Sequence, residues 1–172
     1  GNIEPLKKVL MTGNGRCNYW NEDMDIKYYH SNEEELLQSI ITEDNQEEIL
    51  RFFEKLGIVP KIKNGYYYPF SNQALSIKKA LLSEAERLGV IFKNNYRVRE
   101  IKKINDQFVI DKTMTFDKVI LATGGKSYPK TGSDGFGFGL AKSFGHSVES
   151  LYPSLVALKV NSNLNSLWNG VR

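Results

Sequence analysis

One stretch of the sequence, Lys118–Lys142, constrains the fold more than any other. It opens with the apolar run Val119–Ala122 and breaks at Thr123–Gly125. A short apolar run that ends in glycines is typical of a buried strand in a parallel sheet. A second set of glycines, within Gly132–Gly139, leads into a segment with helical spacing. We therefore predict a strand–loop–helix unit within an α/β fold.

The loop Thr123–Gly125 is the place where we expect a ligand. Ligands of open α/β sheets lie beyond the carboxyl ends of the strands, and a helix N-terminus attracts phosphate groups. The glycine spacing matches neither a dinucleotide fingerprint nor a P-loop. Strand–loop–helix units also occur without a nucleotide, so a nucleotide or flavin site and a purely structural unit both stay open here.

A second glycine-rich segment lies near the start of the chain. The apolar run Lys8–Thr12 predicts a strand that enters Gly13–Asn18. The glycines permit a backbone that wraps an anion, and Arg16 offers a planar cationic fork for phosphate or carboxylate. Cys17 has no neighbouring histidine that would support a nucleophile, so we interpret it as a small packed apolar group.

The middle of the chain predicts compact local units. Residues 32–57 have the pattern of a helical hairpin, and Asn64-Gly65 is the preferred turn of a β-hairpin. Apolar positions from Ala74 to Leu88 predict a third helix. The run Val90–Phe92 predicts a strand, and residues 96–116 predict an antiparallel meander.

Composition narrows the class of protein. The 172 residues are 41% hydrophobic and 25% charged, which is typical of a globular chain. A net charge of +3 with scattered lysines argues against nucleic acid as a partner, and no apolar run approaches a membrane span. The single cysteine fits a reducing compartment, so we expect a cytoplasmic protein. His, Cys, Asp and Glu show no spacing typical of a metal site.

Five blocks of the sequence resemble one known family when they are taken together in order. They are Lys7–Asn18, Gly65–Ala74, Val119–Ser133, the glycine-rich helix entry up to Ala141, and Gly145–Leu158. The chain resembles bacterial FAD-dependent flavoproteins of the BaiN/YhiN type, also described as aminoacetone oxidase family FAD-binding enzymes. The GRCN and ATGGxSYPxTGS blocks are specific in combination, whereas ATGG alone recurs in many flavoproteins.

The resemblance implies FAD as the cofactor. It implies a partial glutathione-reductase-like, Rossmann-type FAD-binding domain over residues 1–150, with the helical hairpin as an insertion and the meander as its antiparallel part. Residues 151–172 would begin an inserted substrate domain. The residues that the resemblance implies at the cofactor are Thr12, Gly13, Asn14, Gly15, Arg16, Cys17, Asn18, Thr123, Gly124, Gly125, Gly132 and Ser133.

Two departures from the family pattern bear on the site. Asp134 stands two places away from the aspartate of the Gly-Asp-Gly that relatives carry there, and Tyr66 replaces an arginine of many relatives. The family's first βαβ unit with GxGxxG has no counterpart in this sequence. We therefore expect a fragment of a longer enzyme, with either self-association or an altered local fold around Lys8–Asn18.

Two functions follow as hypotheses. The first is a fragment of an FAD-dependent oxidoreductase that acts on a small organic substrate, in which Arg16, Tyr66 and Tyr68 line the substrate side and no side chain is assigned a catalytic role. The second is a non-catalytic binding or interaction module that does not retain flavin. Flavin retention discriminates the two.

Overall fold

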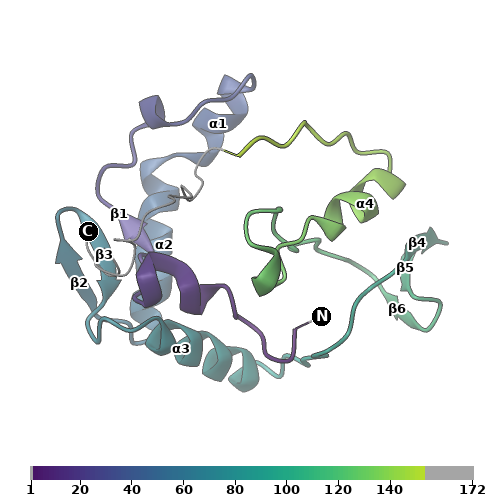
Figure 1. Cartoon of the computed structure of the whole chain (residues 1–172), viewed down its shortest axis with the longest axis horizontal. Helices are drawn as coiled ribbons and strands as arrows, with labels where there is room; N and C mark the ends of the chain where they lie inside the picture. Colours follow the sequence, from purple (N-terminus) through teal and green to yellow (C-terminus); the bar gives the residue numbers. More distant parts are fainter. Residues whose placement is uncertain (1, 154–172) are drawn as a thin grey trace, which may run out of the picture.

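The computed structural model describes residues 2–153. Figure 1 shows the elements in two groups, joined by extended segments and by the N-terminal residues. The first group comprises η1 (Val9–Gly15), β1 (Trp20–Asn21), η2 (Ile26–Tyr28), α1 (Glu34–Ile40), α2 (Glu43–Lys55), β2 (Pro60–Lys63), β3 (Tyr66–Pro69) and α3 (Ala74–Arg87). The second comprises β4 (Ile101–Ile104), β5 (Gln107–Ile110), β6 (Met114–Phe116), η3 (Pro129–Thr131) and α4 (Phe136–Ser143).

The first group is built on a small antiparallel sheet in the order β1-β3-β2. Lys63 pairs with Tyr66 at the closed end of the hairpin, and both Asn64 and Gly65 have positive φ angles. Two consecutive residues with positive φ make the turn that matches the twist of paired strands. The hairpin predicted from Asn64-Gly65 is confirmed.

The two helices predicted within residues 32–57 are also confirmed, as α1 followed by α2. Thr42 Oγ1 accepts a hydrogen bond from the Asn45 N–H at 3.2 Å and so caps the start of α2. Gly57, with a φ of +76°, ends it, and Ile58 N donates to Phe53 O at 3.0 Å. This left-handed residue after the last turn is the usual glycine stop of a helix.

The main core lies where α3 meets η1 and β3. Its buried members are Cys17, Ile58, Ala74 and Ile77. Half-buried side chains of η1, α2 and α3, of Tyr19 before β1 and of Leu56 after α2 pack around them: Val9, Leu10, Tyr19, Phe53, Leu56, Ala80 and Leu81. This packing fixes the segment that follows η1 against α3.

The second group contains the meander β4-β5-β6, which is antiparallel throughout. Its strands are confirmed, although β4 begins at Ile101 rather than near residue 96. Leu140 of α4 and Ile101 of β4 are buried, and the rings of Phe108 and Phe144 lie 6.0 Å apart. A cavity of about 420 Å³ lies between these elements and Leu121.

Three predicted strands are wrong. Lys8–Thr12 runs into η1, where Thr12 Oγ1 donates to Val9 O at 2.7 Å and competes with an extended backbone. Val90–Phe92 and Val119–Ala122 form no strand, and Ile120 is 90% exposed. A strand needs a neighbour for its ladder, and within residues 2–153 no strand pairs with either segment. Both sheets of the described part are antiparallel. This part therefore has a mixed α/β fold in which the parallel strand predicted at Val119–Ala122 is not formed.

Other expectations fall outside what the structure describes. The substrate domain predicted for 151–172 lies almost wholly beyond residue 153. The apolar run Ser154–Val160, whose pattern by itself predicts a strand, also lies outside the described residues. Within residues 2–153, no helix is both long and apolar enough to cross a membrane.

Candidate functional site

The first candidate loop, Thr12–Asn18, begins within η1, where the backbone leaves the helical conformation at Thr12, Gly13 and Asn14. Gly13, Asn14, Gly15 and Cys17 all have positive φ angles, between 53° and 80°. Cys17 N donates to Thr12 O at 3.0 Å and closes the loop. The glycines are therefore required by the backbone path, which explains why the sequence alternates them with asparagine, a residue that tolerates this conformation.

Packing holds this loop in place on its inner side. The Cys17 side chain is 7% exposed and lies in the main core, as expected for a packed thiol. A Cβ on Gly13 would lie 2.7 Å from the Asn18 backbone nitrogen, so the two strands of the loop touch. Asn14, Gly15 and Asn18 remain exposed, which leaves the outer side of the loop accessible.

Arg16 and Tyr68, two of the three residues expected to line the substrate side, meet at this loop. The guanidinium carbon of Arg16 lies 4.8 Å from the Tyr68 ring centroid, and Arg16 Nε donates to Gly13 O at 3.2 Å. The stacking orients a cationic fork beside the glycine backbone. Tyr66 points to the same face of β3 as Tyr68 and is 44% exposed.

The second candidate loop, Thr123–Gly125, is fixed by the turn that follows it. Gly125 O accepts a hydrogen bond from Gly135 N at 3.1 Å. Gly124, with a φ of +72°, approaches Ser133, and a Cβ there would lie 3.2 Å from Ser133 Oγ. Thr123 lies against Gly137 in the first turn of α4. The loop and the start of α4 thus form one packed unit.

Gly132 and Ser133 complete this unit. Gly132 has a φ of +98°, and a Cβ on it would lie 2.7 Å from the Asn2 amide nitrogen, which donates to Thr131 O at 2.9 Å. Ser133 is only 5% exposed. A cavity of about 350 Å³ opens beside the unit and is lined by Asn2, Tyr96, Arg97, Val98, Thr123, Pro129, Gly132, Asp134, Phe136 and Leu140.

The Asp134 carboxylate is a charged group at this cavity and is bound by two donors. The Phe136 N–H and the Arg97 guanidinium both donate to its carboxylate and lower the pKa of Asp134 below its usual range. Arg97 also stacks over the Phe136 ring, 4.3 Å from its centroid. Asp134 is therefore ionised at neutral pH and fully engaged, as a structural partner of the first turn of α4.

Lys8 connects the two halves of the site. Its ammonium donates to Ser127 Oγ at 2.7 Å and to Ser133 Oγ at 3.1 Å. The loop after Thr123–Gly125 is thereby tied to the residue directly before η1. The predicted site residues thus fall into two sets. The first set, Thr12–Asn18, packs against Tyr68 and α3. The second lies at the start of α4 and consists of Thr123, Gly124, Gly125, Gly132 and Ser133, and the hydrogen bonds of Lys8 connect the two sets.

Sequence reasoning missed Lys8, Asn2 and Arg97. All three act across long separations, so no local pattern marks them; Lys8 and Ser127 are 119 positions apart. The one signal available was the position of Lys8 directly before the glycine-rich segment.

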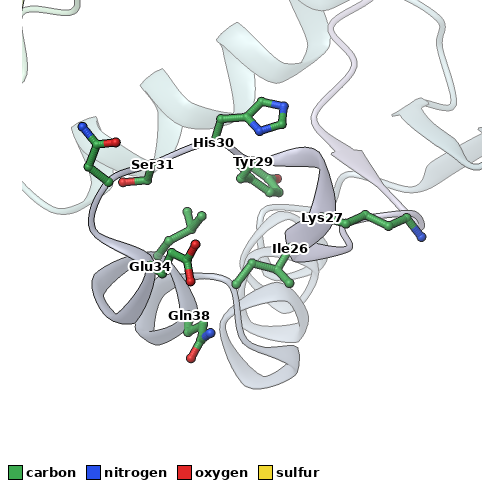
Figure 2. Close-up of a pocket in the computed structure, with 9 residues that line it drawn as sticks. Ile26, Lys27, Tyr29, His30, Ser31, Glu34 and Gln38 are labelled. Carbon is green, nitrogen blue, oxygen red and sulfur yellow. The ribbon is translucent and has the colours of Figure 1, made fainter.

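A larger cavity, of about 570 Å³, lies in the segment between η2 and α1. Figure 2 shows Tyr29, Ile26 and Glu34 around it, with the Lys27 side chain pointing away. The Lys27 ammonium is paired with Asp25 at 2.9 Å. This cavity contains none of the predicted cofactor residues. No three His, Cys, Asp or Glu side chains of residues 2–153 cluster as a metal site.

Two glycine-rich loops that follow apolar segments, one of them leading into α4, are features that this chain shares with Rossmann-type domains, although the described residues form only antiparallel sheets. The chain belongs to the HI0933-like protein Rossmann domain family, whose profile it matches over residues 1–161.

Curated relatives agree with this family. The chain is 41% identical over 169 residues to 3-dehydro-bile acid delta(4,6)-reductase of Clostridium scindens, an alignment that covers 96% of this chain and 41% of the relative. It is 29% identical to ribosomal RNA dihydrouridine synthase of Escherichia coli over 94% of the chain and 41% of the relative. The chain is 28% identical to the ribosomal RNA dihydrouridine synthase of Haemophilus influenzae, over 87% of this chain and 39% of the relative. The chain thus spans about two-fifths of their length.

Proposed function

We propose that this chain is part of an FAD-dependent oxidoreductase that reduces a carbon–carbon double bond conjugated to a carbonyl group. The observation that carries the proposal is the 41% identity, along 96% of the chain, to a protein named as a bile acid reductase. The non-catalytic module without flavin is the competing hypothesis.

The names of the relatives share one chemistry. A 3-dehydro, delta(4,6) bile acid has double bonds in conjugation with its 3-oxo group, and dihydrouridine is uridine with its ring double bond reduced next to a carbonyl. Each reduction adds one hydride and one proton across the double bond. Reduced FAD, when bound, supplies the hydride and is oxidised by two electrons. A reduced nicotinamide nucleotide would restore it.

The residues of the site fit such a group. Gly124 and Gly132 let the loop pack closely on Ser133 and Asn2, because a Cβ at either position would crowd those side chains. The exposed residues Asn14, Gly15 and Asn18 offer backbone and amide groups to a polar ligand. We propose that Thr12–Asn18, Thr123–Gly125, Gly132 and Ser133 hold the cofactor. Arg16 over Tyr68 is placed to orient an anionic group of the substrate.

We further propose a small organic substrate rather than RNA. The higher identity to the bile acid reductase than to the dihydrouridine synthases, 41% against 29% and 28%, favours it, and so does the modest charge of +3. We also propose that the chain self-associates and that the protein is located in the cytoplasm. Light scattering of the purified protein tests the first.

The test is a titration with FAD followed by an anaerobic assay with a reduced nicotinamide nucleotide. We expect saturable quenching of flavin fluorescence and loss of dienone absorbance with a 3-oxo-4,6-diene bile acid. Gly124→Ala should weaken FAD binding because its Cβ would crowd Ser133, whereas Gly139→Ala, which has no atom within 4 Å of its Cβ, should not. Absence of FAD binding would support the non-catalytic module, and reduction of uridine in ribosomal RNA alone would overturn the substrate class.

A further inference from the structure

The Lys8 ammonium has an unusual set of partners. It donates to two serine hydroxyls, Ser127 Oγ at 2.7 Å and Ser133 Oγ at 3.1 Å, and no carboxylate of residues 2–153 forms an ion pair with it. Some cations of the described part are paired with acids instead, as Lys78 is with Glu4 at 2.7 Å and Arg97 with Asp134 at 2.7 Å. The charge of Lys8 is thus held in place without being neutralised.

The cluster also retains hydrogen-bond donors. An ammonium has three N–H donors, and the two serines use two of them. Each hydroxyl accepts from Lys8 and keeps its own O–H to donate. Lys8 and Ser127 are exposed, whereas Ser133 is 5% exposed and fixes the ammonium from the protein side. One N–H and the Ser127 O–H therefore remain available to a ligand from solvent.

The surroundings favour a negative ligand. Two further lysines, Lys126 and Lys130, belong to the same loop as Ser127. The two acids on neighbouring segments, Glu4 and Asp134, are each bound to a cation of their own. An anion at Lys8 would meet a positive local field with little competition from carboxylates.

We propose that Lys8, Ser127 and Ser133 form a binding site for a phosphate-type oxyanion. Charge-assisted hydrogen bonds from one ammonium and one hydroxyl suit the tetrahedral oxygens of such a group. The group belongs either to the diphosphate of a nucleotide cofactor or to an anionic substituent of the substrate. The site itself requires only the geometry above; its assignment to either source rests on the proposed function.

Calorimetry with inorganic pyrophosphate tests the site. We expect saturable binding to the protein and a rise in Kd of about tenfold or more in Lys8→Met, equivalent to about 1.4 kcal/mol. Lys7→Met, which removes an adjacent exposed lysine, is the matched control and should leave Kd within about twofold. Lys8→Arg keeps the charge and should restore most of the affinity. Absence of saturable binding, or equal losses in Lys7→Met and Lys8→Met, would overturn the site.

Ser127→Ala is a second test of the site that does not depend on whether Lys8→Met folds. Its hydroxyl is exposed, so the variant should keep the melting temperature and still bind pyrophosphate several-fold more weakly. Unchanged affinity in this variant would contradict the proposed geometry.

Two further measurements identify the source of the anion. Exclusion of pyrophosphate by saturating FAD, with FAD affinity reduced in Lys8→Met, assigns the site to the cofactor. Pyrophosphate binding that persists in FAD-saturated protein, together with a KM for the bile acid that rises in Lys8→Met, assigns it to the substrate. Pyrophosphate binding through Lys8 in a protein that reduces no substrate would leave the site intact and reject the proposed reaction.

Discussion

Thr123 lies against the backbone of Gly137, so that a side chain on Gly137 would overlap the Thr123 hydroxyl and lie 2.9 Å from its Cβ. Thr123 opens the second glycine-rich loop, and Gly137 is buried in the first turn of α4. The position of the loop is therefore set by a glycine on the helix it packs against, as well as by its own glycines.

Gly137→Ala should destabilise the protein. Alanine in a helix interior normally stabilises relative to glycine by up to about 1 kcal/mol, but overpacking costs about 1–3 kcal/mol. We expect the second effect to win, measured as the free energy of unfolding in urea. Gly139→Ala is the control, because its Cβ would meet nothing within 4 Å, and it should be neutral or stabilising. Equal stability of the two variants would show that Thr123 moves aside freely.

Gly13→Ala should cost more stability than Gly15→Ala. Both residues have positive φ, so each substitution places an alanine in the left-handed region at a cost of about 1–2 kcal/mol. Only at Gly13 does the new Cβ also approach a backbone atom, Asn18 N at 2.7 Å, whereas at Gly15 it would lie 3.9 Å from Leu10 O. Urea unfolding of both variants gives the difference, and similar losses would contradict the close approach.

The stacking of Arg16 on Tyr68 should appear as a coupling energy. A partly exposed cation–π pair contributes about 0.5–1 kcal/mol. We expect that value from a double-mutant cycle of Arg16→Met and Tyr68→Leu on the free energy of unfolding. Tyr68→Phe keeps the ring and should preserve the coupling. Strict additivity of the two single variants would mean that the contact contributes nothing.

The Lys78–Glu4 pair should make stability depend on pH in the acidic range. The hydrogen bond and charge of Lys78 lower the pKa of Glu4 from its ordinary value of 4.5. A carboxyl whose pKa is lowered by folding stabilises the protein fully above its unfolded pKa and loses that contribution as the pH falls through the folded pKa. Thermal unfolding of the wild type and of Glu4→Gln should therefore differ at neutral pH and converge in acid. A difference that does not change with pH would argue against the pair.

The sequence predicted the units whose determinants are local. The turn Asn64-Gly65, the glycine stop at Gly57 and the helical pattern from Ala74 each depend on residues within a few positions, and all three formed as expected. Arg16 and Tyr68 were grouped from the sequence as lining residues, but their stacking depends on where β3 places Tyr68.

The failures share one cause. Val90–Phe92 and Val119–Ala122 have the composition of buried strands, but a strand exists only when a neighbour completes its hydrogen bonds, and in the described residues none does. Lys8–Thr12 packs as η1 on α3 instead of extending.

By itself, then, the sequence determined the backbone freedom of two glycine-rich loops and the local helices and hairpins beside them. Only the tertiary structure decided which side chains meet at those loops, such as Lys8 with Ser127 and Ser133, or Asn2 with Thr131. The physical reason is that glycine conformations and helix periodicity are encoded within a few residues. A hydrogen bond between residues more than a hundred positions apart depends on how the whole chain packs.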